Sequence, residues 1–181
     1  MNFSFLKNPI VRFLVTFGFL YLVWYLLYEL ILHPWGKLDS VVINNSIFFS
    51  SHILELFGFV TFTSHSETMR TLGIDGTHGL WIGDPCNGIA LFSLFSFFIL
   101  AYPGKWKTKL WFIPAGIISI HLINILRITA LCIIVYKNPE YLEFNHTYTF
   151  TILVTAYVFL LWLLWAKKFS STKMSVKWIC D

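Results

Sequence analysis

Charged residues are scarce in this chain of 181 residues. Asp, Glu, Lys and Arg together make up 12% of the sequence, about half of their usual share in a soluble domain. Hydrophobic residues make up 57% of the chain, and aromatic residues make up 19%. Because so few charges cannot cover a water-facing surface, the composition excludes an ordinary soluble domain and predicts an integral membrane protein.

Cysteine is scarce as well, with three widely separated copies at Cys86, Cys132 and Cys180. This number excludes a disulfide framework, and without a Cys-x-x-Cys pair we expect no metal site and no other cofactor. The formal net charge is +4, but no basic patch is interleaved with polar recognition residues, so no nucleic-acid partner is expected. Internal repeats are also missing, and we expect a single membrane domain over residues 1–181.

Long apolar runs predict where the chain crosses the membrane, since a spanning helix needs about 20 apolar residues. Residues 10–32, 110–136 and 147–166 meet this length, and the first run is too long for a signal-peptide core. The apolar run at residues 87–102 is shorter than this length, and it can cross only if its ends are buried in protein. Residues 41–62 contain several polar side chains and indicate an interfacial or re-entrant helix. The predicted fold class is an all-α polytopic membrane protein with about four transmembrane helices.

Basic residues support this count, because loops rich in Lys and Arg stay on the cytoplasmic side. Four crossings with both termini inside place nine of the thirteen basic residues on one side. These nine are Lys7, Arg12, Lys105, Lys107, Lys109, Lys167, Lys168, Lys173 and Lys177. We therefore expect residues 167–181 to form a cytoplasmic basic tail, and the remaining loops to face outward.

The outer face is expected to carry a small β-hairpin over residues 68–83. Two short runs flank Asp75-Gly76, and an Asp-Gly pair is a strong signal for a two-residue hairpin turn. The hairpin leads directly to Cys86.

Cys86 lies in the stretch "DPCNG", at the mouth of an apolar run. With Asp84 as N-cap and the following proline at the first helical position, the amides of a helix N-terminus would favour the thiolate. Gly88 leaves room for a ligand or backbone to approach. A small apolar filler is the alternative for any membrane cysteine, and Cys132 in "LCIIVY" fits it well. Cys180 is expected to be an inert thiol in the tail.

Arg127 occurs in "HLINILRITAL", about 13 Å from the outer end of its predicted helix. A charge at this depth costs a few kcal/mol and needs a compensating role. His121, Asn124 and Arg127 are expected to share a polar face directed into the bundle. An arginine suits oxyanion stabilisation because it stays protonated and offers a rigid fork of donors. The alternative is a structural arginine paired with Glu55 or Asp84.

His146 occurs in "EFNHTYTF", where the last predicted helix begins on the outer side. A helix N-terminus would keep the ring neutral and able to accept a thiol proton, although a histidine here can also be a simple polar cap. The other outer histidines lack metal-ligand spacing and are expected to be solvated; they are His33, His52, His65 and His78. A thiol, a cation and an imidazole on one side of the membrane are the groups required for nucleophilic acyl transfer.

The order "CNGI" at residues 86–89, "NILRI" at residues 124–128 and His146 at the last helix resembles the exosortase and archaeosortase family of membrane cysteine transpeptidases. The resemblance covers residues 41–166, in a chain shorter than the larger members. It implies a bacterial inner-membrane enzyme, facing outward, that cleaves C-terminal sorting signals from secreted proteins.

The resemblance also implies roles for individual residues. Cys86 would form the thioester, His146 would transfer the proton, and Arg127 would stabilise the oxyanion. The substrate-binding or supporting residues are expected to be Asp84, Asn87, Gly88, His121 and Asn124. The expected partners are substrates that carry a recognition motif, a transmembrane helix and a basic tail, together with a surface acceptor molecule and membrane lipids.

Two other functions are compatible with the residues alone. One is a membrane scaffold protein in which Arg127 binds a partner helix or a lipid headgroup, so that replacing Cys86 would be nearly silent. The other is an outer-face acyltransferase that carries a lipid acyl chain on the same cysteine.

Overall fold

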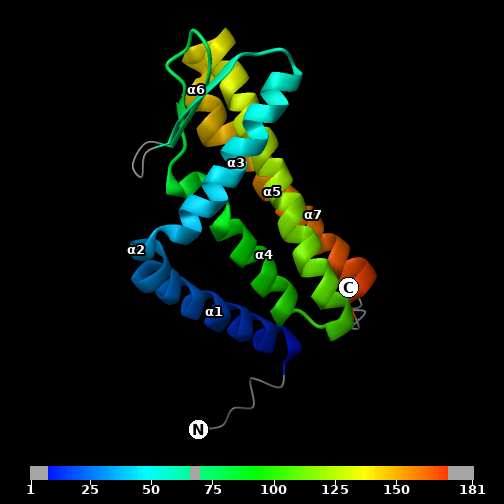
Figure 1. Ribbon diagram of the computed structural model, residues 1–181. Coiled ribbons are helices and arrows are strands. Elements are labelled where there is room, and N and C mark those ends of the chain that lie inside the picture. The colour runs from blue at the N-terminus through cyan, green and yellow to red at the C-terminus, as the bar shows by residue number, and fades with distance from the viewer. Residues whose placement is uncertain (1–7, 66–69, 171–181) are drawn as a thin grey trace.

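The computed structural model describes residues 8–65 and 70–170, which form a mostly helical chain with a small sheet at one end (Figure 1). The main elements are α1 (Pro9–Leu27), α2 (His33–Trp35), α3 (Lys37–Leu56), β1 (Thr61–His65), β2 (Arg70–Ile74), β3 (Leu80–Trp81), α4 (Ile89–Ala101), α5 (Trp106–Lys137), α6 (Leu142–Phe144) and α7 (Phe150–Leu164). Most of the predicted basic tail, together with Lys7 and Cys180, lies outside the described residues.

Three helical stretches are long and apolar enough to cross a membrane, namely Pro9–Trp35, Trp106–Lys137 and Pro139–Phe169. They correspond to three of the predicted spans, so the expectation of a polytopic helical protein is confirmed. The predicted fourth span is not confirmed, because α4 has only 13 residues. Such a helix is about 20 Å long, whereas the hydrocarbon core of a bilayer is about 30 Å thick.

The sheet is antiparallel, with strand order β1-β2-β3, and it packs on α3 and on the C-terminal half of α5. Strands β2 and β3 form a hairpin around Asp75-Gly76, but the predicted two-residue turn is wrong, because residues 75–79 separate the two strands. Strand β1 was not expected. The predicted helix over residues 41–62 is wrong at its end, because α3 stops at Leu56 and Thr61 begins β1. Gly58 follows the helix with a φ of 83°, a left-handed conformation that ends an α-helix.

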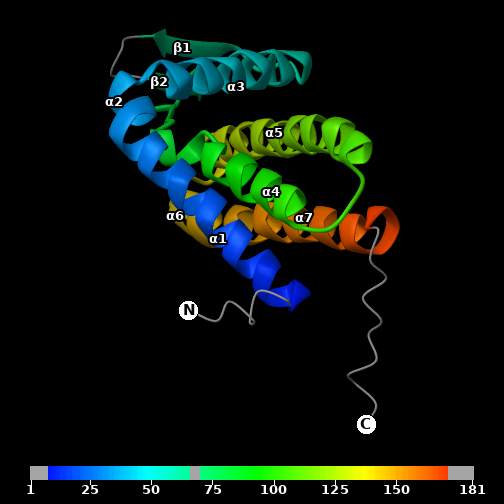
Figure 2. The same cartoon turned by 90° about the horizontal axis from the view of Figure 1, so that it is seen from below.

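Two apolar cores hold these elements together. Around the sheet, one core joins α3, β2, the residue that follows β3 and α5; its buried members are Ile43, Ile47, Leu54, Leu72, Ile74, Ile82, Ile128 and Cys132. At the other end of the bundle, the second core joins α4, α5 and α7 through Phe95, Ile99, Tyr102, Phe112, Ile120, Val158 and Trp165. Helix α1 has no buried residue and lies along α4, as Figures 1 and 2 show.

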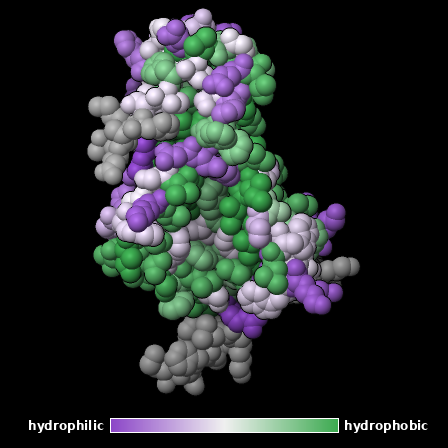
Figure 3. Space-filling model, in the orientation of Figure 1, coloured by the Kyte–Doolittle hydropathy of each residue, from purple (hydrophilic) through white to green (hydrophobic). Residues whose placement is uncertain are grey.

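Charge is distributed unequally between the two ends. Exposed basic residues surround the end that contains the second core; they are Arg12, Lys105, Lys107, Lys167 and Lys168. Lys109 is different, because it is buried and its ammonium donates to the carbonyls of Leu100 and Tyr102 at the end of α4. Figure 3 shows apolar side chains over much of the lower helical part and hydrophilic residues towards both ends.

Candidate active site

Cys86 closes a short 3₁₀ turn, Asp84–Cys86, whose N-cap is Gly83. Helix α4 begins only at Ile89, after Gly88 with a φ of 82°. The prediction that Asp84 caps a helix containing Cys86 in its first turn is therefore wrong. The thiol lies before α4, in a separate turn that the left-handed glycine disconnects from the helix.

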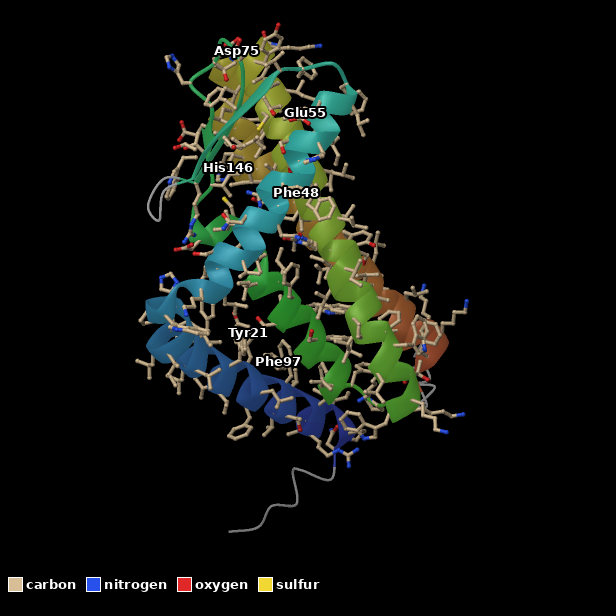
Figure 4. All side chains as sticks on the ribbon, viewed as in Figure 1. Tyr21, Phe48, Glu55, Asp75, Phe97 and His146 are labelled. Carbon is tan, nitrogen blue, oxygen red and sulfur yellow. The ribbon has the colours of Figure 1, made fainter. Side chains whose placement is uncertain are left out.

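The Cys86 sulfur lies 3.3 Å from Nε2 of His146, although 60 residues separate them in the chain. His146 belongs to a π-helical turn, Asn145–Thr149, within the continuous helical stretch Pro139–Phe169. Its predicted position at a helix N-terminus is wrong, because the helical stretch begins seven residues earlier. Single π-turns inside helices are frequent at functional sites. Figure 4 shows His146 beside the strands of the sheet.

Arg127 is half-buried on α5 and lines the same small cavity as Cys86 and His146. This cavity of about 10 Å³ is otherwise lined by apolar side chains, namely Leu80, Trp81, Ile82, Ile128 and Leu131. Neither carboxylate considered as a structural partner binds Arg127. Asp84 forms an ion pair with Arg70, and Glu55 accepts a hydrogen bond from Thr61.

Two asparagines fix the backbone around the thiol. Asn124 donates from Nδ2 to the carbonyl oxygen of Cys86 at 2.9 Å, which connects α5 to the 3₁₀ turn. The buried Asn87 accepts a hydrogen bond from the backbone N–H of Ile89 at 2.8 Å and thereby caps α4. The role of both asparagines as substrate-binding or supporting residues stays a prediction. A Cβ at Gly88 would lie 3.3 Å from the ring of Phe92, so a side chain of α4 approaches this glycine.

His121 is not part of this arrangement. It lines a separate cavity of about 540 Å³ between α3, α4 and α5, and its Nε2 lies 2.7 Å from Oδ1 of Asn45. The predicted common face of His121 and Arg127 is therefore wrong. Within residues 8–65 and 70–170, no group of three His, Cys, Asp or Glu side chains could hold a metal ion.

A buried carboxylate that the sequence analysis did not identify supports the Cys86 turn. Asp39 on α3 is 1% exposed and accepts hydrogen bonds from the Tyr28 hydroxyl and from Nδ2 of Asn87. Nδ1 of His33, a residue expected to be solvated, lies 3.6 Å from its second oxygen. Asp39, on α3, thus contacts both the residue that follows α1 and the residue that follows Cys86. In the sequence Asp39 lies just before the predicted interfacial helix over residues 41–62 and belongs to no motif.

Replacing Asp39 with alanine is expected to lower the free energy of unfolding by about 2–5 kcal/mol, because the Tyr28 hydroxyl and the Asn87 amide both lose their buried acceptor. Thermal unfolding of the purified protein in detergent measures this change. Glu140→Ala is the matched control, since it removes an exposed carboxylate and should change stability by less than about 0.5 kcal/mol. Equal stability of the two variants would contradict a structural role for Asp39.

Residues 9–165 match the family described as transmembrane exosortase, which covers most of the chain and all of the candidate site residues. No curated protein and no solved structure matches the chain. Together with its three apolar helices, this match makes the chain a multi-pass membrane protein that belongs to the transmembrane exosortase family.

Proposed function

We propose that this exosortase is a cysteine transpeptidase or endopeptidase that cleaves the C-terminal sorting signals of secreted proteins through a thioester on Cys86. The observation that carries this proposal is the 3.3 Å contact between the Cys86 sulfur and the His146 ring, in a cavity shared with Arg127. Family membership supports a role in protein processing. The shared cavity supports roles for Cys86 as nucleophile, His146 as proton acceptor and Arg127 as permanent cation.

The proposed reaction has two halves. His146 accepts the thiol proton as the Cys86 sulfur attacks the scissile carbonyl carbon, and Arg127 stabilises the resulting oxyanion. The carbon–nitrogen bond then breaks, the amine leaves with the proton from His146, and the acyl group remains on sulfur. In the second half an amine or hydroxyl of the acceptor, or water, attacks the thioester. Its proton passes to His146 and then to the released sulfur.

Supporting groups act on the backbone rather than on the reacting atoms. The Asn124 hydrogen bond to the Cys86 carbonyl and the Asn87 cap of α4 fix the turn that carries the thiol. Asp39 fixes Asn87 in turn. Because rates fall steeply when reacting groups move by as little as 1 Å, these contacts support preorganisation of Cys86 towards His146.

The charge distribution supports an orientation in a bacterial inner membrane. Five of the seven exposed basic residues that the structure describes surround one end of the helices, the other two being Lys37 and Lys137, and basic segments stay on the cytoplasmic side. The described carboxylates lie in the segments of the other end, which also contains Cys86; they are Glu29, Asp39, Glu55, Asp75, Asp84, Glu140 and Glu143. In the proposed orientation both termini are cytoplasmic and the active site faces outward, where secreted substrates pass.

The test is to trap the acyl group on Cys86. The enzyme is mixed in detergent with tagged reporters that carry the C-terminal segments of secreted proteins from the same genome, each ending in an apolar helix and a basic cluster. After acid quenching and proteolysis, mass spectrometry of the Cys86 peptide should show a hydroxylamine-sensitive peptide adduct. A fatty acyl adduct would instead support the acyltransferase alternative, and the absence of any adduct with every reporter would contradict thioester chemistry.

A further inference from the structure

Among the residues that the structure describes, no strand pairs with the outer edge of the strand nearest to the candidate active site. Strand β3 pairs with β2 on one side and, in the strand order β1-β2-β3, it is the last strand. Leu80 and Trp81 of this strand both line the small cavity of Cys86, Arg127 and His146. The unpaired edge of the sheet is therefore next to the thiol.

The direction of the backbone groups on β3 follows from its pairing with β2. The N–H of Ile82 donates to the carbonyl of Arg70 at 2.8 Å, and Leu80 is opposite Leu72 in the same register. In an antiparallel pair the backbone groups of successive residues point alternately to the partner strand and away from it. The N–H and C=O of Trp81 therefore point away from β2, towards the unpaired edge.

A cavity of about 580 Å³ lies along this edge. It is lined by Gly79, Leu80 and Trp81 on one side, and by Pro139, Glu140, Leu142, Glu143 and His146 on the other. No residue of β2 lines it, which places the cavity on the side of β3 that faces away from the sheet. One end of the space reaches His146, whose ring contacts the Cys86 sulfur.

We propose that an extended segment of the sorting signal binds here as an additional strand, exchanging backbone hydrogen bonds with Trp81 and presenting its scissile carbonyl to Cys86. This inference rests on the proposed function and specifies how that function recognises a peptide. Addition of a strand to a free sheet edge binds the main chain of a peptide, while pockets on alternate sides select its side chains. It also gives hydrogen-bond partners to the two backbone groups of Trp81 that point away from β2.

The indole of Trp81 controls access to the thiol in this arrangement. Its side chain is 64% exposed and lies over Gly83, where a Cβ would be 2.5 Å from the ring. The small cavity beside the sulfur is lined by Trp81 as well as by Cys86, Arg127 and His146. In the proposed arrangement the indole shifts when a peptide enters, and Gly83 provides the space for the ring in the free enzyme.

The charge of the cavity limits which peptides fit. Its two charged side chains among the described residues are the carboxylates of Glu140 and Glu143, and both are exposed. A peptide residue beside them is expected to be basic or neutral, because like charges repel. Acidic residues are disfavoured at the same position.

The test compares Trp81→Pro with Trp81→Ala in the full-length enzyme, using a reporter that the wild type cleaves in a Cys86-dependent manner. Both variants lose the indole, but only proline also loses the N–H that would bind the peptide. Proline is compatible with this edge position because the N–H of residue 81 does not pair with β2. We expect the cleavage rate of Trp81→Pro to be lower than that of Trp81→Ala by a factor of about ten or more, because proline removes one backbone hydrogen bond to the peptide.

Iodoacetamide labelling of Cys86 shows whether both variants keep an intact site, and equal labelling is expected.

A second measurement does not depend on the fold of any variant: reporter peptides with a single N-methyl group at successive backbone positions are offered to the wild-type enzyme. One position near the scissile bond should lose cleavage about tenfold or more. Equal cleavage by the two Trp81 variants and tolerance of every N-methyl group would overturn strand addition while the cysteine mechanism stands. Absence of Cys86-dependent cleavage of all reporters contradicts the proposed function itself, and this inference with it.

Discussion

Replacing Cys86 with alanine is expected to abolish processing of every sorting-signal reporter, while the protein still inserts and folds. Alanine removes the sulfur that would carry the acyl group, and no other described thiol is near His146. The side chain of Cys86 contributes only a partly buried contact to the core around the sheet, so its loss should have little effect on stability. The measurement is the fraction of tagged reporter cleaved in membranes, with enzyme levels determined by immunoblotting.

Cys132 provides the matched control for this experiment. It is 2% exposed, packs within the same core and is not part of the cavity that contains His146. Cys132→Ala removes the same atoms and should cost about 1 kcal/mol of stability while processing continues. A Cys86→Ala enzyme that processes reporters at the wild-type rate would exclude the cysteine mechanism and favour the scaffold function. Loss of processing in both variants would indicate misfolding rather than chemistry.

The apolar runs predicted most of the helical framework, since length and hydropathy are local properties of a sequence. The apolar runs predicted less about elements that are stabilised by contacts between segments distant in the sequence. Strand β1 is a five-residue run that becomes a strand only by pairing with β2, so its pattern alone could not separate it from the end of α3. The predicted fourth crossing is not confirmed for the same reason, because the position of the short α4 depends on the segments packed around it.

In the candidate site, too, short motifs predicted some residues, whereas residues that depend on contacts between distant segments were missed or misplaced. "CNGI", "NILRI" and the later histidine predicted three residues that do line one cavity. His121 was placed wrongly because six residues on a helix correspond to a separation of about 120° and roughly 9 Å. These values are large enough for His121 and Arg127 to face different cavities. Asp39 was missed because its partners Tyr28 and Asn87 lie 11 and 48 residues away, so no short motif contains them.

Replacing His146 with alanine is expected to slow reporter cleavage by about 10²–10⁴-fold, which is the usual contribution of a positioned general acid and base. The imidazole is 3.3 Å from the sulfur and is proposed both to accept the thiol proton and to protonate the leaving amine. Its loss should therefore also slow alkylation of Cys86 by iodoacetamide at neutral pH. The two measurements together separate activation of the thiol from binding of the peptide.

His121→Ala is the matched control, because it removes the same ring from α5 in the other cavity. It should leave both cleavage and alkylation within a few-fold of wild type. The sequence alone grouped His121 with Arg127, whereas the structure places His146 beside Cys86. This pair of variants therefore also tests which of the two histidines takes part in the reaction. If His121→Ala slows cleavage as much as His146→Ala, the common effect must come from packing around α5, and the 3.3 Å contact between His146 and Cys86 would lose its assigned role in proton transfer.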